Sequence, residues 1–346
     1  MKLTLLLKNI VLKKSYLLLL VFVIHFSCNN KKEFRHQLTT KSQPWTHQIF
    51  DDSEDKFTFA LFADLTGGER SGVFDVAIAQ LNLLRPNFII NVGDLIEGDH
   101  KNLGELKNQW DTFDNRVEKA IAPVFYVGGN HDLSDAQMTE VWETRYGATY
   151  YHFIYKNVLF LVLNTEDNSI ERIKTIKQLR TTAIDIYKSE GLDAFNKTAY
   201  ALLPERTAGN IGNIQSDYFI DIIKKYPNVK HTFLFLHKPA WKKENEQNFS
   251  RIEKALENRP YTVFNGHVQA YGYEKRYNQD YIQLATTGGE QFPTLGRSMD
   301  HITMVTVDNS KVDIANVLLN GILDKTGHIP LKGEQLCFEK EKCKTQ

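Results

Sequence analysis

An apolar run meets a polar turn in the stretch Pro-Val-Phe-Tyr-Val-Gly-Gly-Asn-His-Asp, residues 123–132. A run of β-forming residues that stops at two glycines predicts a strand followed by a tight turn. Strand ends are where α/β proteins place reactive side chains, so Asn130, His131 and Asp132 are expected to face a cleft. A lone motif of this kind is more often an ordinary polar turn. The interpretation therefore depends on whether similar strand ends recur.

The residues before this stretch alternate between predicted strands and helices. Strands are expected at 56–63 and 88–92, helices at about 72–85 and 103–120, and the strands end at Asp64 and at Gly93-Asp94. Strand, helix, strand, helix, strand is the rhythm of a mostly parallel sheet. The sequence thus predicts an α/β fold in which successive strands end in carboxylates or an amide.

The second half continues this pattern after an interruption. A hairpin is expected at 150–163, and the polar segment 164–210 reads as a helical and loop insertion over one face of the sheet. A helix is then expected at 214–226. The strand 232–236 ends at His237, and the strand 261–264 ends at Asn265-Gly266-His267-Val268-Gln269. Further strands complete one domain over residues 56–320, with 321–346 as a C-terminal tail.

The N-terminus has the pattern of an export signal. Residues 1–27 contain four lysines and no acidic residue, and the lysines precede the apolar run Tyr16–Ile24. This run is short for a membrane span and typical of a signal peptide. Phe26-Ser27-Cys28 resembles a bacterial lipoprotein cleavage box, which predicts a lipid anchor at Cys28 in the cell envelope. A plain cleaved signal and an uncleaved anchor are the alternatives. The polar residues 28–55 are expected to be a tether.

Charge and cysteine content limit the partners. The chain has 42 basic and 42 acidic residues, and without residues 1–27 the balance is 38 to 42, so it carries no nucleic-acid signature. Beyond Cys28, the remaining cysteines are Cys337 and Cys343. In an oxidising compartment they can close a disulfide loop, and two free thiols near the chain end are the alternative.

The polar strand ends form one set when they are collected. They are Asp64, Gly93-Asp94, Asn130-His131-Asp132, His237 and Gly266-His267. Carboxylates, one amide and imidazoles are the ligands of a hydrolytic site with two divalent ions. Each residue alone has an ordinary structural explanation, such as a helix cap, a core histidine or a turn. Five such strand ends in one order favour a metal site.

The order Asp-x-x, Gly-Asp, Gly-Asn-His-Asp, His, Gly-His-x resembles that of the calcineurin-like metallophosphoesterases, from about Lys56 to Val307. The resemblance implies a four-layer αββα sandwich of two mixed β-sheets flanked by helices. It also implies two divalent metal ions, whose identity among Mn, Fe, Zn, Mg and Ca stays open, and a phosphate-ester substrate. By motif position, Asp94 corresponds to the bridging carboxylate, Asp64 to a ligand of the first ion, and Asn130, His237 and His267 to ligands of the second. His131 corresponds to the catalytic imidazole that protonates the leaving alkoxide, with its ring oriented by Asp94 or Asp132.

Two positions depart from the family pattern. Thr66 and Gln269 stand where the family commonly has histidines, and both of those histidines would bind the first ion. The purple acid phosphatase branch has a Tyr three residues after the Gly-Asp aspartate, and here that position is Glu97. We therefore expect a first site of oxygen donors from Asp64, Asp94, Glu97 and the Gln269 carbonyl, with Thr66 as a further candidate. Such a site prefers Mn²⁺, Mg²⁺ or Ca²⁺ over Zn²⁺. The alternative for Glu97 is a solvated loop acid.

The residues and the resemblance together predict an exported, membrane-tethered phosphoesterase that hydrolyses a phosphate mono- or diester. One alternative is a degenerate relative that binds metal and phosphate without turnover, and another is a structural module of the cell envelope. The intact Asn130, His131, His237 and His267 argue against a purely structural role. The segment 170–210 is expected to shape the substrate pocket.

Overall fold

The computed structural model describes residues 34–50, 56–98 and 100–340. The described helices are α2 (Val73–Leu84), α3 (Leu103–Val117), α4 (Asn130–Leu133), α5 (Ala136–Tyr146), α6 (Ile170–Glu190), α7 (Leu192–Phe195), α8 (Asn213–Lys225) and α9 (Asn248–Ala255). The described strands are β1 (Phe34–His36), β2 (Phe57–Phe62), β3 (Phe88–Asn91), β4 (Val124–Phe125), β5 (Tyr151–Tyr155), β6 (Val158–Val162), β7 (Thr232–Phe235), β8 (Tyr261–Asn265), β9 (Gly272–Arg276), β10 (Gln279–Gln283), β11 (His301–Asp308) and β12 (Lys311–Leu318).

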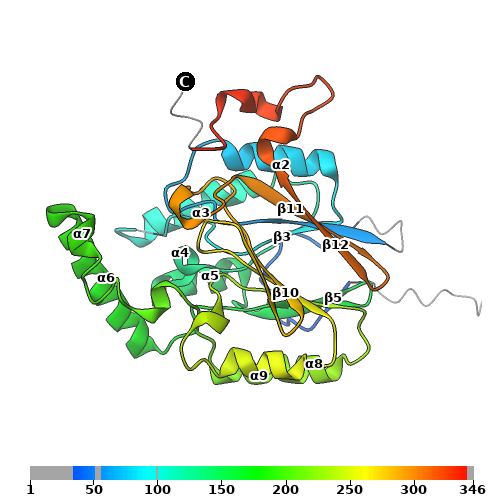
Figure 1. Ribbon diagram of the computed structural model, residues 1–346, viewed down its shortest axis with the longest axis horizontal. Helices are drawn as coiled ribbons and strands as arrows, with labels where there is room; N and C mark the ends of the chain where they lie inside the picture. Colours follow the sequence, from blue (N-terminus) through cyan, green and yellow to red (C-terminus); the bar gives the residue numbers. More distant parts are fainter. Residues whose placement is uncertain (1–33, 51–55, 99, 341–346) are drawn as a thin grey trace, which may run out of the picture.

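Two mixed sheets form the centre of the molecule. The described strands build a seven-stranded sheet in the order β1-β5-β6-β7-β8-β10-β9 and a five-stranded sheet in the order β12-β11-β2-β3-β4. In each sheet the strands that carry the motifs are parallel, including the edge strand β4, whereas the edge strands β1, β9 and β12 pair antiparallel. Helices α2 and α3 cover one side of the pair, and α8 and α9 cover the other (Figure 1). This arrangement confirms the expected αββα sandwich.

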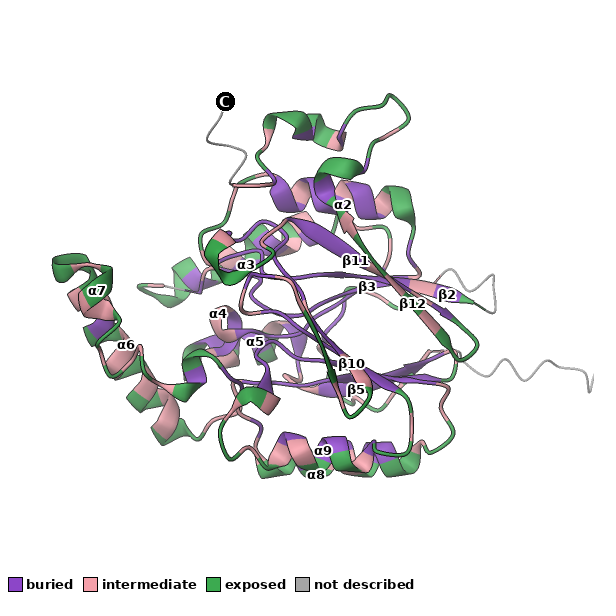
Figure 2. Ribbon diagram, in the orientation of Figure 1, coloured by how far each residue is buried: buried purple, intermediate pink, exposed green. Residues whose placement is uncertain are grey.

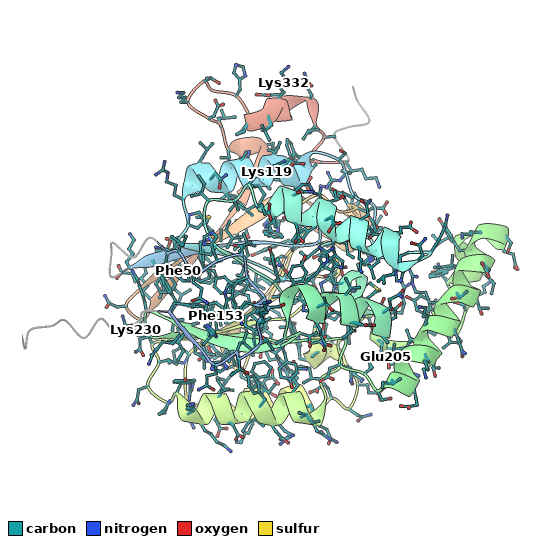
Figure 3. The ribbon with its side chains drawn as sticks, turned by 180° about the vertical axis from the view of Figure 1, so that it is seen from behind. Phe50, Lys119, Phe153, Glu205, Lys230 and Lys332 are labelled. Carbon is teal, nitrogen blue, oxygen red and sulfur yellow. The ribbon has the colours of Figure 1, made fainter. Side chains whose placement is uncertain are left out.

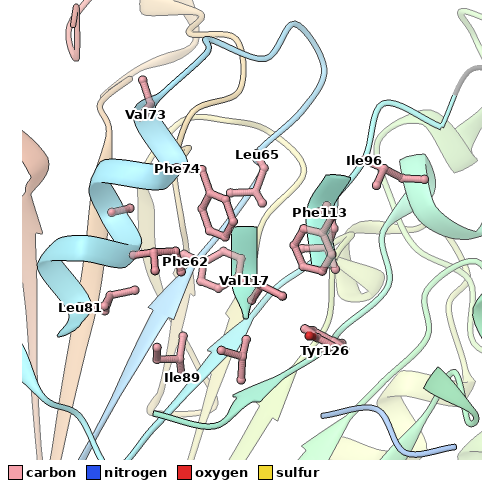
Figure 4. Packing of buried hydrophobic residues seen from close by; sticks show 14 of the residues in the cluster. Phe62, Leu65, Val73, Phe74, Leu81, Ile89, Ile96, Phe113, Val117 and Tyr126 are labelled. Atoms are coloured by element: carbon pink, nitrogen blue, oxygen red, sulfur yellow. The ribbon is translucent and has the colours of Figure 1, made fainter. Parts of the chain in front are cut away.

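Three apolar layers hold the four structural layers together. One lies between the five-stranded sheet and helices α2, α3 and α5, and Figure 4 shows Phe74 and Phe113 beside Phe62 in this layer. A second lies between the sheets, where the rings of Phe153 and Phe160 stack with centroids 4.5 Å apart. A third lies under α8 and α9. The central strands are buried on both faces, as Figure 2 shows, which is why they read as continuous apolar runs.

Local sequence explains where the helices near the site begin and end. Helix α3 begins after Asn102, whose side-chain oxygen accepts a hydrogen bond from the backbone N–H of Glu105 at 3.0 Å. Helix α2 ends at Arg85, which adopts a left-handed conformation with φ 50°. Pro86 follows and cannot continue the helix, because it lacks the backbone N–H that the helix requires.

The described part of the expected tether belongs to the folded body. Residues 34–36 form β1, which pairs antiparallel with β5. Trp45 is buried against Phe125 and Tyr151, with ring centroids 5.4 and 5.8 Å away. The prediction of a tether over 28–55 is therefore wrong for 34–50, because a few well-placed aromatic side chains outweigh the polar composition.

The expected C-terminal tail is also partly folded. Ile322, Ile329 and Phe338 are buried in the apolar layer that contains α2. Cys337 is disulfide-bonded, which agrees with the expected disulfide and not with the alternative of free thiols. Its expected partner, Cys343, lies outside the described residues. The sandwich therefore extends beyond residue 320.

Helices α6 and α7 form an arm that stands away from the sheets (Figure 1). The arm does not lie over a sheet face, as the sequence had suggested for 164–210. Within the described helix α6, Ala183 is the only buried residue. Figure 3 shows Glu205 near the base of the arm, whereas Phe153 lies in the middle of the body.

Among residues 34–50, 56–98 and 100–340, no helix combines the length and apolar character that a membrane span needs. The expected signal peptide and the lipid anchor at Cys28 lie outside the described residues.

Candidate metal centre

The motif residues gather at one edge of the two sheets. Asp64, Asp94 and Asn130 follow the parallel strands β2, β3 and β4, and His237 and His267 follow the parallel strands β7 and β8. The carboxyl ends of parallel strands meet at a common edge, which is where α/β folds bind ligands. The sandwich therefore brings together side chains that are two hundred positions apart in the sequence.

His237 is the centre of the more complete ligand set. Its Nδ1–H donates to the carbonyl of Val92 at 2.8 Å, so the Nε2 atom is turned towards the other ligands. Nε2 lies 3.1 Å from Asp94 Oδ2 and 3.2 Å from Asn130 Oδ1. Asp94, His237 and His267 offer ligand atoms that all lie within 4.8 Å of one another.

His267 is oriented by the segment that follows the arm. Its Nε2–H donates to the carbonyl of Arg206 at 2.7 Å, in the short 3-10 helix Pro204–Arg206. This bond leaves Nδ1 free to act as a ligand, because a backbone carbonyl can only accept. A carboxylate, an amide oxygen and imidazole nitrogens thus converge on one point, which is a set that fits a divalent cation.

The electrostatics of the two central side chains support this fit. Burial lowers the pKa of His237, but the neighbouring Asp94 carboxylate outweighs burial and raises the pKa to about 9. Burial raises the pKa of Asp94, and the His237 and His131 imidazoles together with hydrogen bonds hold it well below its usual range. The carboxylate therefore stays ionised, and a cation bound there takes the place of the shared proton.

The first set is built around Asp64. This side chain is buried, and its carboxylate accepts the backbone N–H of His267 at 3.0 and 3.2 Å. The Nε2 of Gln269 donates to the carbonyl of Thr66 at 3.1 Å, while its buried Oε1 has no hydrogen-bond partner among the described residues. A buried amide oxygen without a partner is costly, so the Oε1 of Gln269 fits the role of a ligand for a cation.

Thr66 and Glu97 have other roles. The hydroxyl of Thr66 donates to the carbonyl of Ile96 at 2.8 Å. The carboxylate of Glu97 accepts the backbone N–H groups of Gly67, Gly68 and Glu69 at 3.2, 3.1 and 3.0 Å. Glu97 is therefore neither brought into the ligand cluster nor left as a solvated loop acid. It holds the loop after β2.

His131 lines the cavity beside the ligands. Its Nδ1–H donates to the carbonyl of Glu97 at 2.6 Å, and its backbone N–H donates to Asp94 Oδ1 at 2.9 Å. The expectation that Asp94 or Asp132 orients the ring is wrong, because the Asp132 carboxylate accepts backbone N–H groups of Gly129 and of residues 94–96. Backbone carbonyls leave no side-chain signature in a sequence, so motif analysis could not identify this partner.

Crowding by the carboxylates of the site explains two glycines in the motifs. A Cβ atom on Gly129 would lie 2.3 Å from Asp94 Oδ1, and one on Gly266 would lie 2.3 Å from Asp64 Oδ2. Either contact is impossible, so these positions need a hydrogen in place of a side chain.

The site residues Asp64, Asp94, His267 and Gln269 themselves have left-handed backbones, with φ between 49° and 75°. Strain of this kind gathers at functional sites.

The site opens into a cavity of about 670 Å³ that reaches the arm. Asn130, His131 and His267 line it at the metal end. Sequence analysis missed the buried ion pair between Lys238 and Glu166, which also lines the cavity, with Nζ 2.8 Å from Oε1. Its only sequence signal is that Glu166 lies four residues after the end of β6 and Lys238 three residues after the end of β7.

Part of the chain is similar to a curated phosphatase. Over 108 residues the chain is 35% identical to the Serine/threonine-protein phosphatase CPPED1 of Mus musculus, a match that covers 29% of this chain and 34% of that protein. The chain thus matches about a third of the length of this curated relative.

Solved structures support the fold. A dimetal phosphatase from Danio rerio is 14% identical with a TM-score of 0.50, and the match covers 76% of this chain and 98% of that one. PhoD is 12% identical with a TM-score of 0.51, and the match covers 81% of this chain and 68% of that one. A model of the calcineurin-like phosphoesterase family, whose members use divalent metals, matches residues 57–284, which is well over half of the sequence. The chain therefore belongs to the calcineurin-like phosphoesterase family.

Proposed function

We propose that this protein is a metal-dependent phosphoesterase that hydrolyses a phosphate ester in the cavity beside the β-strand ends. The observation that carries the proposal is the convergence of Asp94, Asn130, His237 and His267, with the Nδ1 proton of His237 and the Nε2 proton of His267 directed away from the ligand cluster. A scaffold needs no such arrangement of acceptors. Divalent ions bound there supply the charge that lowers the pKa of a water and neutralises phosphoryl oxygens.

We also propose two ions of unequal character. Asp64, Asp94 and the Gln269 Oε1 would hold the first ion, and Asp94, Asn130, His237 and His267 would hold the second. The first set contains oxygen donors alone, so it should prefer Mn²⁺, Mg²⁺ or Ca²⁺ over Zn²⁺. The unpartnered Oε1 of Gln269 supports this assignment.

His131 is the proposed general acid. The Glu97 carbonyl holds its Nδ1–H, so Nε2 is the nitrogen that can exchange a proton in the cavity. The imidazolium form can donate its Nε2 proton to the leaving alkoxide, whose departure without a proton is costly. Imidazole suits this role because its ordinary pKa lies near neutral pH.

Activity should first be measured with p-nitrophenyl phosphate and bis(p-nitrophenyl) phosphate over Mn²⁺, Mg²⁺, Ca²⁺, Zn²⁺ and Fe²⁺, which also separates monoesterase from diesterase activity. In His131→Ala we expect turnover to fall about a hundredfold or more with metal content unchanged. The loss should be larger for an alkyl phosphate than for a p-nitrophenyl ester, because the alkoxide is the poorer leaving group.

The exposed His328 provides the control, and His328→Ala should behave like the wild type. Equal losses for good and poor leaving groups would remove His131 from proton transfer. Metal binding without hydrolysis of any ester would favour the alternative of a degenerate relative. The observation behind that alternative is that positions 66 and 269 are Thr and Gln, where the family commonly has histidines.

We further propose that the chain is exported and anchored by a lipid on Cys28 in the cell envelope. The lysines and the apolar run of residues 1–27 support this. Because β1 begins at Phe34, an anchor at Cys28 would hold the sandwich close to the membrane surface. Radiolabelled palmitate should be incorporated into the wild type and not into Cys28→Ser, and equal labelling would contradict the anchor.

A further inference from the structure

The cavity differs in character between its two ends. Asn130, His131 and His267 of the candidate metal centre line it beside the sheets, and α6 and α7 line it with apolar side chains among charged ones. The apolar lining includes Ile173, Ile176 and Ile184 from α6, Phe195 from α7, and Phe292 and Leu295 from the loop after β10. A single cavity therefore connects a phosphate-binding end to an apolar end.

The apolar end is not part of the protein core. The isoleucines of α6 recur at positions 173, 176 and 184, a spacing that places them on one face of a helix. Such a face normally packs on a sheet, but α6 stands away from both sheets (Figure 1) and these isoleucines are only half-buried. On the opposite wall, Leu295 is 60% exposed. The face is thus available to a ligand.

The charges of the cavity wall disfavour a polyanionic ligand. Lys177 binds Asp135 with Nζ 2.7 Å from Oδ2, and Lys238 binds Glu166 with Nζ 2.8 Å from Oε1. Arg180 and Arg206 also line the cavity, and the full lining holds four basic side chains (Lys177, Arg180, Arg206 and Lys238) and four acidic ones (Glu97, Asp135, Glu166 and Glu205). The lining therefore offers little net positive charge to a second phosphate. Apolar contacts are then the main source of affinity away from the metal centre.

The arm and the metal centre are directly connected. The Arg206 carbonyl accepts the Nε2–H of His267 at 2.7 Å, and the Arg206 guanidinium lies 5.4 Å from the Phe195 ring centroid and 5.1 Å from that of Tyr200. The residue that orients a ligand of the proposed metal therefore also supports the apolar wall. The wall from Ile173 to Ile184 runs for about 16 Å along α6.

We propose that the substrate is a phosphate ester with one long apolar chain, whose phosphate lies at the metal centre and whose chain lies against α6, Phe195 and Leu295. The inference rests on the proposed phosphoesterase function and adds its substrate class. The continuity of the cavity, about 670 Å³ in volume, with the metal ligands carries it.

The test measures binding of alkylphosphonates, which hydrolysis cannot consume, to the Mn²⁺-loaded protein by calorimetry. Methyl-, butyl-, hexyl- and octylphosphonate should bind with affinities that rise about two- to fourfold for each added methylene. Affinity that is independent of chain length would overturn the proposal. Hydrolysis of p-nitrophenyl phosphate is measured separately, so that a protein with activity and no chain dependence refutes only the substrate class.

Two variants and a matched control locate the chain. Ile176→Glu and Leu295→Glu should bring the ratio of octyl- to methylphosphonate affinity close to one, because each places a charge in the apolar wall. Ile170→Glu, on the same helix at a position that is 61% exposed and outside the cavity lining, should retain the wild-type ratio. The same ratio in all four proteins would overturn the proposal.

Other occupants of the groove give distinct results. A phosphoserine peptide that binds the Mn²⁺-loaded protein more tightly than octylphosphonate would overturn the proposal in favour of a protein substrate. Dimers in analytical ultracentrifugation that dissociate in Leu295→Glu would assign the apolar wall to a second copy of the chain, and would also overturn it.

Discussion

At the scale of single residues, backbone carbonyls decide what the imidazoles can do. The carbonyl of Val92 accepts a hydrogen bond from the Nδ1–H of His237, and the carbonyl of Glu97 accepts one from the Nδ1–H of His131. The carbonyl of Arg206 accepts one from the Nε2–H of His267. Each bond leaves the other nitrogen free for a metal or a proton. The sequence identified the three rings, and only their contacts show which nitrogen is available.

Gln269 gives the sharpest residue-scale prediction. In Gln269→His we expect a nitrogen donor in the first site, higher metal content, and a shift in preference from Mn²⁺ towards Zn²⁺, because imidazole suits Zn²⁺ better than an amide oxygen does. Inductively coupled plasma mass spectrometry after equilibration with equal Mn²⁺ and Zn²⁺ measures both quantities.

Gln247→His provides the matched control, since Gln247 is exposed and lies before α9, outside the metal centre. It should keep the wild-type metal content. If metal content and preference stay the same in Gln269→His as well, Gln269 is not a ligand.

At the scale of elements, the segment 34–50 pairs with the edges of both sheets, through β1 with β5 and through residues 44–46 with β4. Thr46 N–H donates to the carbonyl of Val124 at 3.1 Å, and Tyr126 N–H donates to the carbonyl of Pro44 at 2.9 Å. These bonds cover the edge of β4, the strand that leads into the Asn130 turn. Phe34, Trp45 and Phe50 pack this segment against the layer between the sheets. The rest of the segment is polar, so its composition did not indicate a folded element.

Trp45 tests this assignment. Trp45→Ala should lower the free energy of unfolding by about 3–5 kcal/mol, because it removes a buried ring and leaves a cavity. Urea unfolding followed by circular dichroism measures the change. Ile49→Ala should cost little, since Ile49 is 77% exposed, and equal effects of the two substitutions would place Trp45 outside the core.

At the scale of the whole molecule, both ends of the described chain close the sandwich. Residues 34–50 cover the sheets, and Phe338 packs into the layer beneath α2. The Arg70 guanidinium donates to Asp300 and to the carbonyl of Cys337 at 2.8 Å, which ties the C-terminal segment to the loop after Asp64. The metal centre therefore depends on a body larger than the motif region.

Acid should destabilise this body through His301. Its Nε2 accepts the N–H of Ala285 at 3.0 Å, and burial lowers its pKa to about 4. The unfolded chain, with a histidine pKa near 6.5, binds the proton first as pH falls. The contribution of the neutral ring is thus complete above about pH 6.5 and is lost between about pH 6.5 and 4.

His301→Gln should flatten the stability profile in this interval by up to about 1.4 kcal/mol per pH unit, because it removes one titrating group. Denaturant unfolding at several pH values, in EDTA to exclude metal linkage, measures the slope. The exposed His328→Gln serves as the control, and a wild-type slope in His301→Gln would show that His301 does not titrate in this interval.

The sequence by itself predicted an α/β fold with a mostly parallel sheet, and its resemblance to a family supplied the αββα sandwich. The reason is that alternating strand and helix patterns indicate a parallel sheet, and parallel strands place their ends at one edge. The candidate residues Asp64, Asp94, Asn130, His131, His237 and His267 follow from the positions where the apolar runs stop, and the structure brings these positions to one edge.

Only the tertiary structure decided the roles of Glu97, Asp132 and residues 34–50, the direction of the arm, and the apolar end of the cavity. Each of these depends on contacts between segments that are distant in the sequence. The sequence cannot show whether the Glu97 carboxylate binds a metal or backbone N–H groups. Only the folded chain brings the N–H groups of residues 67–69 within hydrogen-bond distance of it.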